Sequence, residues 1–309
     1  MDTDNMKEFI MNFSLDNCAR GNQGYSRVLL QLFGYAGHGK SSFINSCKYI
    51  MDDSEYREYA KVADSREAPE TMMRNSYKLT ENVTLVDNRG GGKMNKMETG
   101  EIYLQLGNFL PLDESVTWQT GFDDMMKKIS ASERQGCAAD FIVPVFVYCT
   151  SSGISLTEVK EMISSARTIT GVDPTVVLTH KLYVPIHQLT KIRDTFRKMG
   201  ARNIYPVENY THGDNLKTKG KHTAILQCLY ESLKDVEFKM KEELNPSEER
   251  IKRKEFLMTF AHKRALENQK QQIKEMQLKE QLEREKEKEK EQEKEQEKAK
   301  RRWYYLWLH

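Results

Sequence analysis

From Tyr25 onward, short apolar runs alternate with amphipathic stretches along the chain. The runs are rich in Val, Ile, Leu and Thr, which favours strands, and the stretches between them have helical spacing. Alternation of this kind predicts an α/β fold with a doubly wound, mainly parallel sheet. The expected strands cover 27–33, 76–80, 83–87, 141–149, 175–179 and 203–207. The expected helices cover 41–51, 122–132, 155–169, 186–199 and 216–238.

The beginning of the chain shows a helical pattern of its own. Apolar positions recur at Met6, Phe9, Ile10 and Phe13 within residues 1–20, before a glycine-containing turn. This spacing predicts a short leading helix that packs on the body of the protein.

After Val236 the pattern is wholly helical, with one interruption at 245–247. Asn245 or Ser247 can cap a new helix there. The apolar residues beyond it keep no strict heptad, so this helix either docks on its own domain or pairs with another helix as a coiled coil. The segment 283–298 is nearly pure Glu, Lys and Gln, as expected of a solvated spacer.

These patterns divide the chain into four parts. We expect a leading helix at 1–24, an α/β domain at 25–240, a helical extension at 241–282 and a charged tail at 283–309.

The tail ends in a basic cluster followed directly by aromatic residues, at 298–302 and 303–308. Such a segment is typical of weak contact with an anionic membrane surface, and equally of a tail that docks on protein.

Composition limits the classes of function. The 309 residues carry 48 Lys and Arg against 46 Asp and Glu, a net charge of +2. This balance excludes binding to nucleic acid through an excess of positive charge. Acidic residues are also interleaved with the basic residues of the tail, so we expect no direct nucleic-acid binding.

The cysteines form no C-x-x-C pair, which predicts that they are small hydrophobic residues and form neither disulfides nor a zinc site. They are Cys18, Cys47, Cys137, Cys149 and Cys228.

Two features bear on location. The N-terminus is acidic from Asp2 and has no basic region before an apolar stretch, which predicts a cytoplasmic protein without a secretory signal. The longest apolar run, 141–149, is shorter than the roughly 20 residues that span a bilayer, so we expect a buried strand.

The clearest motif is GYAGHGKSS at 34–42, which satisfies G-x-x-x-x-G-K-[ST]. It comes after an apolar strand and opens a helix, the context that a phosphate-binding loop (P-loop) requires. Its backbone N–H groups can point into one concavity, to which the helix N-terminus adds positive potential. We expect Lys40 to reach the β- and γ-phosphates and the Ser41 hydroxyl to bind Mg²⁺. The expected phosphate contacts are Gly34, Gly37, His38, Gly39, Lys40, Ser41 and Ser42.

A second motif, Asp87-Asn88-Arg89-Gly90, ends the strand at 83–87. A D-x-x-G in this place holds Mg²⁺ through the carboxylate and the γ-phosphate through the glycine amide. The loop before it offers Thr71, with Ser65 as competitor, to close over the metal and the γ-phosphate. We therefore assign catalytic roles to Lys40, Thr71 and Gly90, and the metal site to Ser41, Thr71 and Asp87.

The loops after the last two strands decide which base is bound. Thr179-His180-Lys181-Leu182 stands where guanine-binding proteins carry [NT]-K-x-D, and Leu182 takes the place of the aspartate. A one-residue shift puts Tyr183 there, so either register lacks the carboxylate, and guanine and adenine both stay open. Asn209, after the final strand, is either a base contact or an ordinary turn residue.

The order of these motifs resembles the interferon-induced protein 44-like family of P-loop GTPase-related proteins, with more distant similarity to immune-associated and septin-like GTPases. The resemblance covers about 25–235 and rests on GYAGHGKSSFINS, DNRGGG, EIYLQLGNF, FVYCTSS, VVLTHK and PVENYT. It implies a Ras-like G domain that binds GTP or GDP with Mg²⁺, in a cytosolic, interferon-linked defensive setting. It also implies base contacts from Thr179, His180, Lys181 and Asn209.

Hydrolysis depends on the residue directly after the second motif. Gly91 stands where Ras-like enzymes have a water-positioning glutamine, so we expect slow turnover unless Arg89, Lys93 or a residue of a second subunit completes the site. The glycines at 90–92 leave this loop free to reorder with nucleotide.

Three functions remain. In the first, a GTP-binding switch, nucleotide orders 52–75 and 88–100 and so controls self-association through the nucleotide domain or partner binding through the tail. The second is a non-hydrolysing scaffold, or pseudo-GTPase, whose segment 247–309 is an interaction module. The third is an ATP-binding protein, which Leu182 allows.

Overall fold

The computed structural model describes residues 2–62, 73–92, 96–117, 121–132, 139–153 and 156–307. The chain divides into two compact units, Met1–Ala261 and His262–His309.

Within the described residues the first unit contains one seven-stranded sheet, in the order β4-β2-β3-β1-β5-β6-β7. Strand β2 runs antiparallel to β3 and β4, and the other neighbours pair in parallel. The doubly wound, mainly parallel sheet predicted from the sequence is thus confirmed. The strands are β1 (Arg27–Phe33), β2 (Met73–Lys78), β3 (Val83–Asp87), β4 (Glu114–Ser115), β5 (Asp140–Cys149), β6 (Thr175–Thr179) and β7 (Ile204–Pro206).

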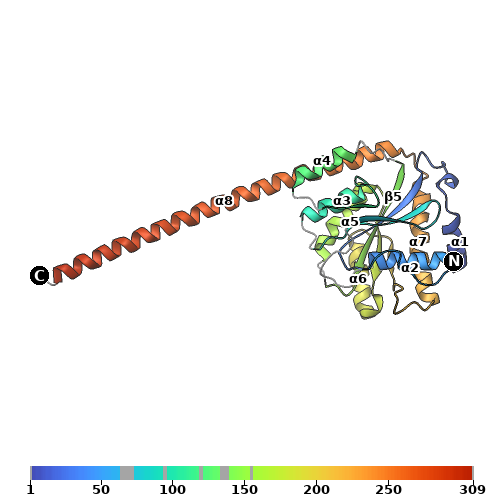
Figure 1. Cartoon of the computed structure of the whole chain (residues 1–309), viewed down its shortest axis with the longest axis horizontal. Helices are drawn as coiled ribbons and strands as arrows, with labels where there is room; N and C mark the ends of the chain where they lie inside the picture. Colours follow the sequence, from blue (N-terminus) through green and yellow to red (C-terminus); the bar gives the residue numbers. More distant parts are fainter. Residues whose placement is uncertain are drawn as a thin grey trace. The chain divides into compact units, whose positions relative to one another are not determined.

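Helices cover both faces of the sheet (Figure 1). One face packs against α1, α2 and α7, and the other is covered by α3, α5 and α6. The helices are α1 (Thr3–Asn12), α2 (Lys40–Asp52), α3 (Lys96–Leu106), α4 (Phe122–Ser132), α5 (Leu156–Thr170), α6 (Ile186–Lys198), α7 (Lys219–Lys239) and α8 (Pro246–Trp307).

The central strand β1 explains why the apolar runs are nearly continuous. Val28, Leu30 and Leu32 face the core shared with α2 and α7, and all residues from Val28 to Phe33 are buried. A parallel strand covered by helices on both faces has no solvent side and therefore no polar alternation. Its carboxyl end leads directly into the P-loop.

The leading helix is shorter than its apolar spacing predicts. It ends at Asn12 because Phe13 is extended, and Ser14 then caps a 3₁₀ turn by accepting a hydrogen bond from the Asp16 amide. Its Phe9 ring packs edge-on against Tyr230 of α7 at 4.9 Å, so the helix does dock on the body.

Helix α3 has no counterpart among the expected elements. Glu101, Ile102, Tyr103, Leu104 and Gln105 are all fully buried. A helix buried on every side shows no amphipathic stripe, so its sequence carries no helical period to detect.

Helix α8 begins as the sequence predicts. The Asn245 side chain accepts hydrogen bonds from the amides of Ser247 and Glu248. Its first turns, up to Ala261, belong to the first unit, where Phe260 is buried with its ring 5.0 Å from that of Tyr103.

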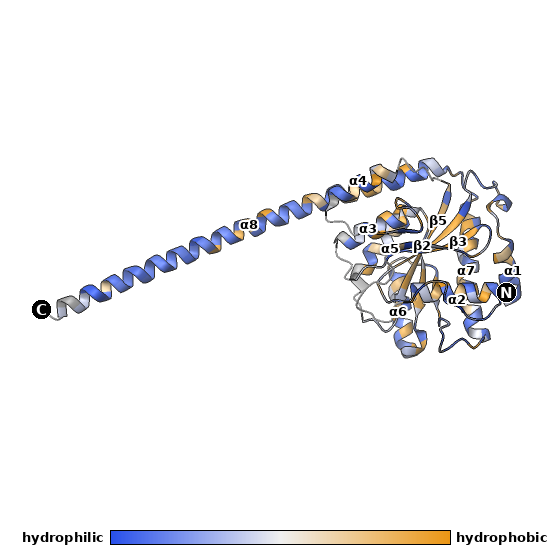
Figure 2. Ribbon diagram, viewed as in Figure 1, coloured by the Kyte–Doolittle hydropathy of each residue, from blue (hydrophilic) through white to orange (hydrophobic). Residues whose placement is uncertain are grey.

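Beyond Ala261 the character of α8 changes. Residues of the second unit are mostly hydrophilic (Figure 2), and the scattered apolar side chains are exposed. They are Leu266, Ile273, Met276, Leu278, Leu282, Trp303, Tyr304 and Trp307. Among the described residues, no helix has the length and apolar character needed to cross a membrane.

The described cysteines are free thiols, as expected of small hydrophobes. Cys47, Cys149 and Cys228 are buried and Cys18 is half-buried, whereas Cys137 lies outside the described residues. Burial raises the pKa of the Cys47 and Cys228 thiols, which keeps them protonated and unreactive.

A buried polar network crosses the first unit and was not expected from the sequence. At its centre Arg74, fully buried in β2, donates hydrogen bonds to Asn88 Oδ1 (3.0 Å), Asn108 Oδ1 (2.8 Å) and the Leu110 carbonyl. Asn88 in turn donates to Gln31 Oε1 in β1. Burial lowers the pKa of Arg74 to about 9, and the Asp140 carboxylate opposes that shift.

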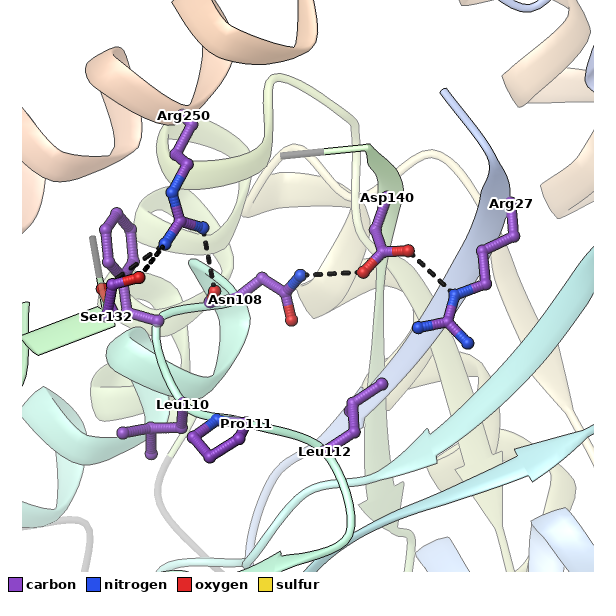
Figure 3. Close-up of a pocket in the computed structure, with 9 residues that line it drawn as sticks. Arg27, Asn108, Leu110, Pro111, Leu112, Ser132, Asp140 and Arg250 are labelled. Atoms are coloured by element: carbon purple, nitrogen blue, oxygen red, sulfur yellow. Dashed lines mark hydrogen bonds and ion pairs between the residues drawn. The ribbon is translucent and has the colours of Figure 1, made fainter. Parts of the chain in front are cut away.

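The network continues to the start of α8 (Figure 3). Asn108 Nδ2 donates to Asp140 (3.1 Å), which also accepts from Arg27 Nε (2.8 Å). Arg250 of α8 donates to the Asn108 carbonyl (3.2 Å) and to Ser132. These residues line a cavity of about 220 Å³. A chain of hydrogen bonds therefore joins the D-x-x-G motif to α8.

Replacing Arg74 with Met removes the centre of this network and leaves Asn88 Oδ1 and Asn108 Oδ1 without their donor. Because a buried unpaired polar group costs about 1–3 kcal/mol, we expect R74M to lower the free energy of unfolding by about 2–5 kcal/mol. Chemical denaturation followed by circular dichroism measures the change. Arg57→Met, at an exposed position, is the control and should change stability by less than about 0.5 kcal/mol. Equal effects at both positions would contradict the role given to Arg74.

Candidate nucleotide-binding site

The P-loop connects β1 to α2 through three glycines with positive φ. Gly34, Gly37 and Gly39 have φ of 134°, 71° and 90°, a backbone that other residues rarely adopt. At Gly34 a Cβ would also lie 2.6 Å from the Val147 carbonyl oxygen. The loop therefore curls tightly at the carboxyl end of the central strand, where ligands bind in doubly wound folds.

Lys40, the first residue of α2, turns back under this loop. Its Nζ donates to the Tyr35 carbonyl at 3.0 Å, and the side chain is buried. Burial lowers the pKa of the Lys40 ammonium, and the Asp87 carboxylate opposes the shift. The ammonium is thus held in place before any ligand arrives.

Asp87 and Ser41 meet directly. Ser41 Oγ donates to Asp87 Oδ2 at 2.6 Å, where β3 ends beside β1. Burial raises the pKa of Asp87, while the Lys40 charge and the Ser41 hydrogen bond lower it. The other oxygen, Asp87 Oδ1, is buried and has no hydrogen-bond partner in the part of the chain that the structure describes.

This orphaned oxygen fits a cation. A carboxylate beside a hydroxyl is an oxygen donor set of the kind that Mg²⁺ prefers. Ser41 and Asp87 are therefore suited to hold Mg²⁺. Thr71, the third expected metal ligand, lies outside the described residues, as do Ser65 and Lys93.

The D-x-x-G loop lies against the P-loop. The Ala36 amide donates to the Gly91 carbonyl at 2.9 Å, and Tyr35 and Gly91 form a parallel bridge. A Cβ on Gly90 would lie 2.5 Å from Lys40 Nζ and 3.0 Å from the Ala36 nitrogen. Close approach, rather than an unusual φ, is what requires glycine at position 90.

The loops after β6 and β7 also contact the P-loop. Thr179 Oγ1 donates to the His38 carbonyl at 2.9 Å, and Asn209 Nδ2 donates to the Gly39 carbonyl at 3.3 Å. Asn209 Oδ1 is buried and without a partner among the described residues. The Asn209 side chain therefore contacts the P-loop directly.

His38 is built into the protein. Its Nδ1 accepts a hydrogen bond from the Cys149 amide at 3.2 Å, and its ring lies between those of Tyr35 and Tyr148. The side chain thus anchors the loop to β5, which leaves its backbone amide as the group suited to phosphate. Sequence reasoning missed Tyr148, whose aromatic character has no distinguishing signal inside an apolar strand.

The remaining candidates lie at the edge of the site. His180 has φ of 57°, and its carbonyl accepts from Thr150 Oγ1 at 2.7 Å. Lys181 begins a 3₁₀ turn that extends to Tyr183, and the Leu182 amide donates to Glu208 at 3.2 Å. Sequence reasoning also missed Glu208, which directly precedes Asn209.

Ser42 and Arg89 complete the set of residues discussed from the sequence. The Ser42 carbonyl accepts from Ser46 Oγ within α2 at 2.7 Å. The Arg89 guanidinium donates to the carbonyl of Val116, the residue directly after β4, at 2.5 Å.

Comparisons with known proteins give structural likenesses, among them two nucleotide-bound proteins. No family model and no curated protein matches the sequence. Translation elongation factor SelB from Methanococcus maripaludis, in complex with the GTP analogue GppNHp, is 14% identical with a TM-score of 0.35, over 66% of this chain and 34% of that one. Era, in complex with MgGDPNP and nucleotides 1506–1542 of 16S ribosomal RNA, is 14% identical with a TM-score of 0.37, over 60% of this chain and 52% of that one. The chain thus spans about a third of the first protein and about half of the second.

The contact between Gly90 and Lys40 can be tested without a ligand. In Gly90→Ala the new methyl group displaces the ammonium or the P-loop, so we expect the free energy of unfolding to fall by about 1–3 kcal/mol. Gly92→Ala is a matched control two residues away, because the nearest atom to its Cβ is Glu98 Oε1 at 3.8 Å. Thermal and chemical denaturation of both variants give the comparison. A Gly90 variant as stable as the Gly92 variant would show that the two loops do not approach this closely.

Proposed function

We propose that the chain binds GTP and GDP with Mg²⁺ and acts as a nucleotide-dependent switch. The observation that carries the proposal is the cluster of Lys40, Ser41, Asp87 and Gly90 at the ends of β1 and β3. It joins a buried ammonium to a buried carboxylate that keeps one free oxygen. Phosphate would stabilise the first charge, and Mg²⁺ the second.

Each group has a role that follows from its chemistry. The amides of the P-loop and of the first turn of α2 would bind phosphate oxygens, because the first turn of a helix leaves its N–H groups without intrahelical partners. Lys40 would lie against the β- and γ-phosphates, and the Gly90 amide against the γ-phosphate. Mg²⁺, held by Ser41 and Asp87, would neutralise charge on the phosphates. We retain Thr71 as the third metal ligand in this proposal.

A switch needs a segment that responds to the γ-phosphate. The loop from Asn88 to Gly92 rests on the P-loop through the Ala36–Gly91 hydrogen bond, next to the proposed phosphate position. A nucleotide that engages Gly90 alters this contact, and the Arg74 network offers a physical route from Asn88 to Arg250 of α8. Self-association of the nucleotide domain and partner binding through α8 are the outputs we propose.

The biological setting is proposed from the sequence motifs. Their order resembles the interferon-induced protein 44-like family, which points to a cytosolic role in innate defence. The exposed aromatic residues Trp303, Tyr304 and Trp307 beside a basic cluster suit a protein partner or weak contact with an anionic membrane.

Replacing Lys40 with Ala tests nucleotide binding. We expect the full chain to bind fluorescent GTP and GDP analogues in the presence of Mg²⁺. K40A should lose at least about 100-fold in affinity, because the nucleotide phosphates lose a charge-assisted hydrogen bond from Lys40. The same samples, run on a sizing column with light scattering, should show a nucleotide-dependent change in oligomeric state that K40A lacks.

Lys48→Ala, on the same helix but paired with Asp52, is the matched control and should bind nucleotide like the wild type. If a folded wild-type chain binds no nucleotide, the proposal is wrong, and an interaction module at 247–309 takes its place.

Hydrolysis gives a separate prediction. Gly91 has no side chain to orient water, and its carbonyl already accepts a hydrogen bond from the Ala36 amide. We therefore expect dilute protein to release phosphate at a rate on the order of 10⁻³ s⁻¹ or slower. A rate per chain that rises with protein concentration would indicate that a second copy supplies the missing group. K40A provides the background rate, and a rate near about 1 s⁻¹ in dilute protein would contradict the expectation.

A further inference from the structure

The loops after β6 and β7, which we expect to contact the nucleotide base, lack the expected aspartate but contain another carboxylate. Leu182, at the aspartate position, is 73% exposed, as is Tyr183, so neither side chain turns into the protein. Of residues 180–185 and 207–215, only Glu208 and Asp214 carry a carboxylate. Asp214 forms an ion pair with Lys221. Glu208 is therefore the carboxylate left for the base position.

The Glu208 carboxylate has few interaction partners within the protein. It is only 9% exposed, and its Oε2 accepts a single hydrogen bond from the Leu182 amide, at 3.2 Å. No cation pairs with it within the described residues, and no hydrogen bond reaches its Oε1 there. Oε1 is not among the buried unpaired side-chain atoms of the described residues, so this oxygen stays open to a hydrogen-bond donor from a ligand.

The backbone places Glu208 at the proposed nucleotide. Its neighbour Asn209 is bonded to the Gly39 carbonyl of the P-loop, and Val207 donates to the Leu178 carbonyl of β6. On the other side, Thr150 holds the His180 carbonyl and so fixes the 180–183 turn. The Glu208 carboxylate therefore lies between this turn and the loop that touches Gly39, within hydrogen-bond distance of the backbone of residue 182 itself.

We infer that Glu208 is the residue that selects guanine, in place of the aspartate missing at position 182; this inference rests on the proposed nucleotide binding. The guanine edge presents two donors, N1–H and the 2-amino group, and a carboxylate accepts both. Adenine presents an acceptor at N1 and only a C–H at C2. Its 6-amino group lies where guanine has O6, so adenine offers no adjacent pair of donors to the carboxylate. A site built for a hydrogen bond rejects a ligand that lacks it more strongly than an apolar pocket rejects a size difference.

The test is a change of base preference in the full chain. Gln at position 208 keeps an acceptor oxygen for the Leu182 amide but offers an NH₂ donor to the base. XTP carries an oxygen where GTP carries the 2-amino group. Glu208→Gln should therefore weaken the binding of GTP by about 10- to 100-fold and strengthen the binding of XTP. We expect the GTP-to-XTP affinity ratio, measured by competition against a fluorescent nucleotide, to fall by at least about 100-fold.

Two further variants separate base reading from folding. Glu243→Gln, at an exposed position, should leave the ratio unchanged, and Glu208→Ala should lower GTP affinity without the gain in XTP. If Glu208 only supports the turn, GTP and XTP affinities will fall together, or neither will change, and either result overturns this inference alone. A wild type that binds ATP as tightly as GTP also overturns it. A folded wild type that binds no nucleotide overturns the proposed function and this inference with it.

Discussion

The close approach of two loops is the constraint on which the site depends. The β1–β3 register sets Leu32 opposite Asp87, so the chain leaves both strands at the same height, and the D-x-x-G loop comes to rest on the P-loop. Lys40 is held between them. Glycine at 34 and at 90 results from close packing at this end of the sheet, because a Cβ at either position would strike a neighbouring backbone or the ammonium. The backbone geometry and the residue choice have one physical cause.

The site is electrostatically incomplete as it stands. Burial pushes the pKa of Lys40 down and that of Asp87 up, so each charge is disfavoured by its surroundings and only partly compensated by the other. Asn209 Oδ1 repeats the pattern in the loop after β7, as a buried polar atom without a hydrogen-bond partner among the described residues. Groups held in this way gain most from a ligand that brings the opposite charges and the missing donors.

Motifs made of contiguous residues could be predicted from the sequence, whereas contacts between residues far apart in the chain could not. The P-loop could be predicted because glycine spacing, the preceding strand and the following helix are contiguous, and the strands at 27–33, 83–87 and 175–179 have the predicted limits. Glu208 could not be assigned, since its partner is an amide 26 positions away whose own side chain faces solvent. Helix α3 was missed for another reason, because burial on all sides erases the helical period.

The Arg74 network has a consequence for how this sequence changes during evolution. Arg74 and Asn108 each form hydrogen bonds with more than one neighbour, so replacing either alone leaves a buried or half-buried polar group without its partner. Residues linked by such hydrogen bonds are expected to be conserved together or substituted together. Among relatives of this chain, Asn88, Arg74, Asn108 and Asp140 should therefore covary as one inherited unit, although they lie on four separate segments of the chain.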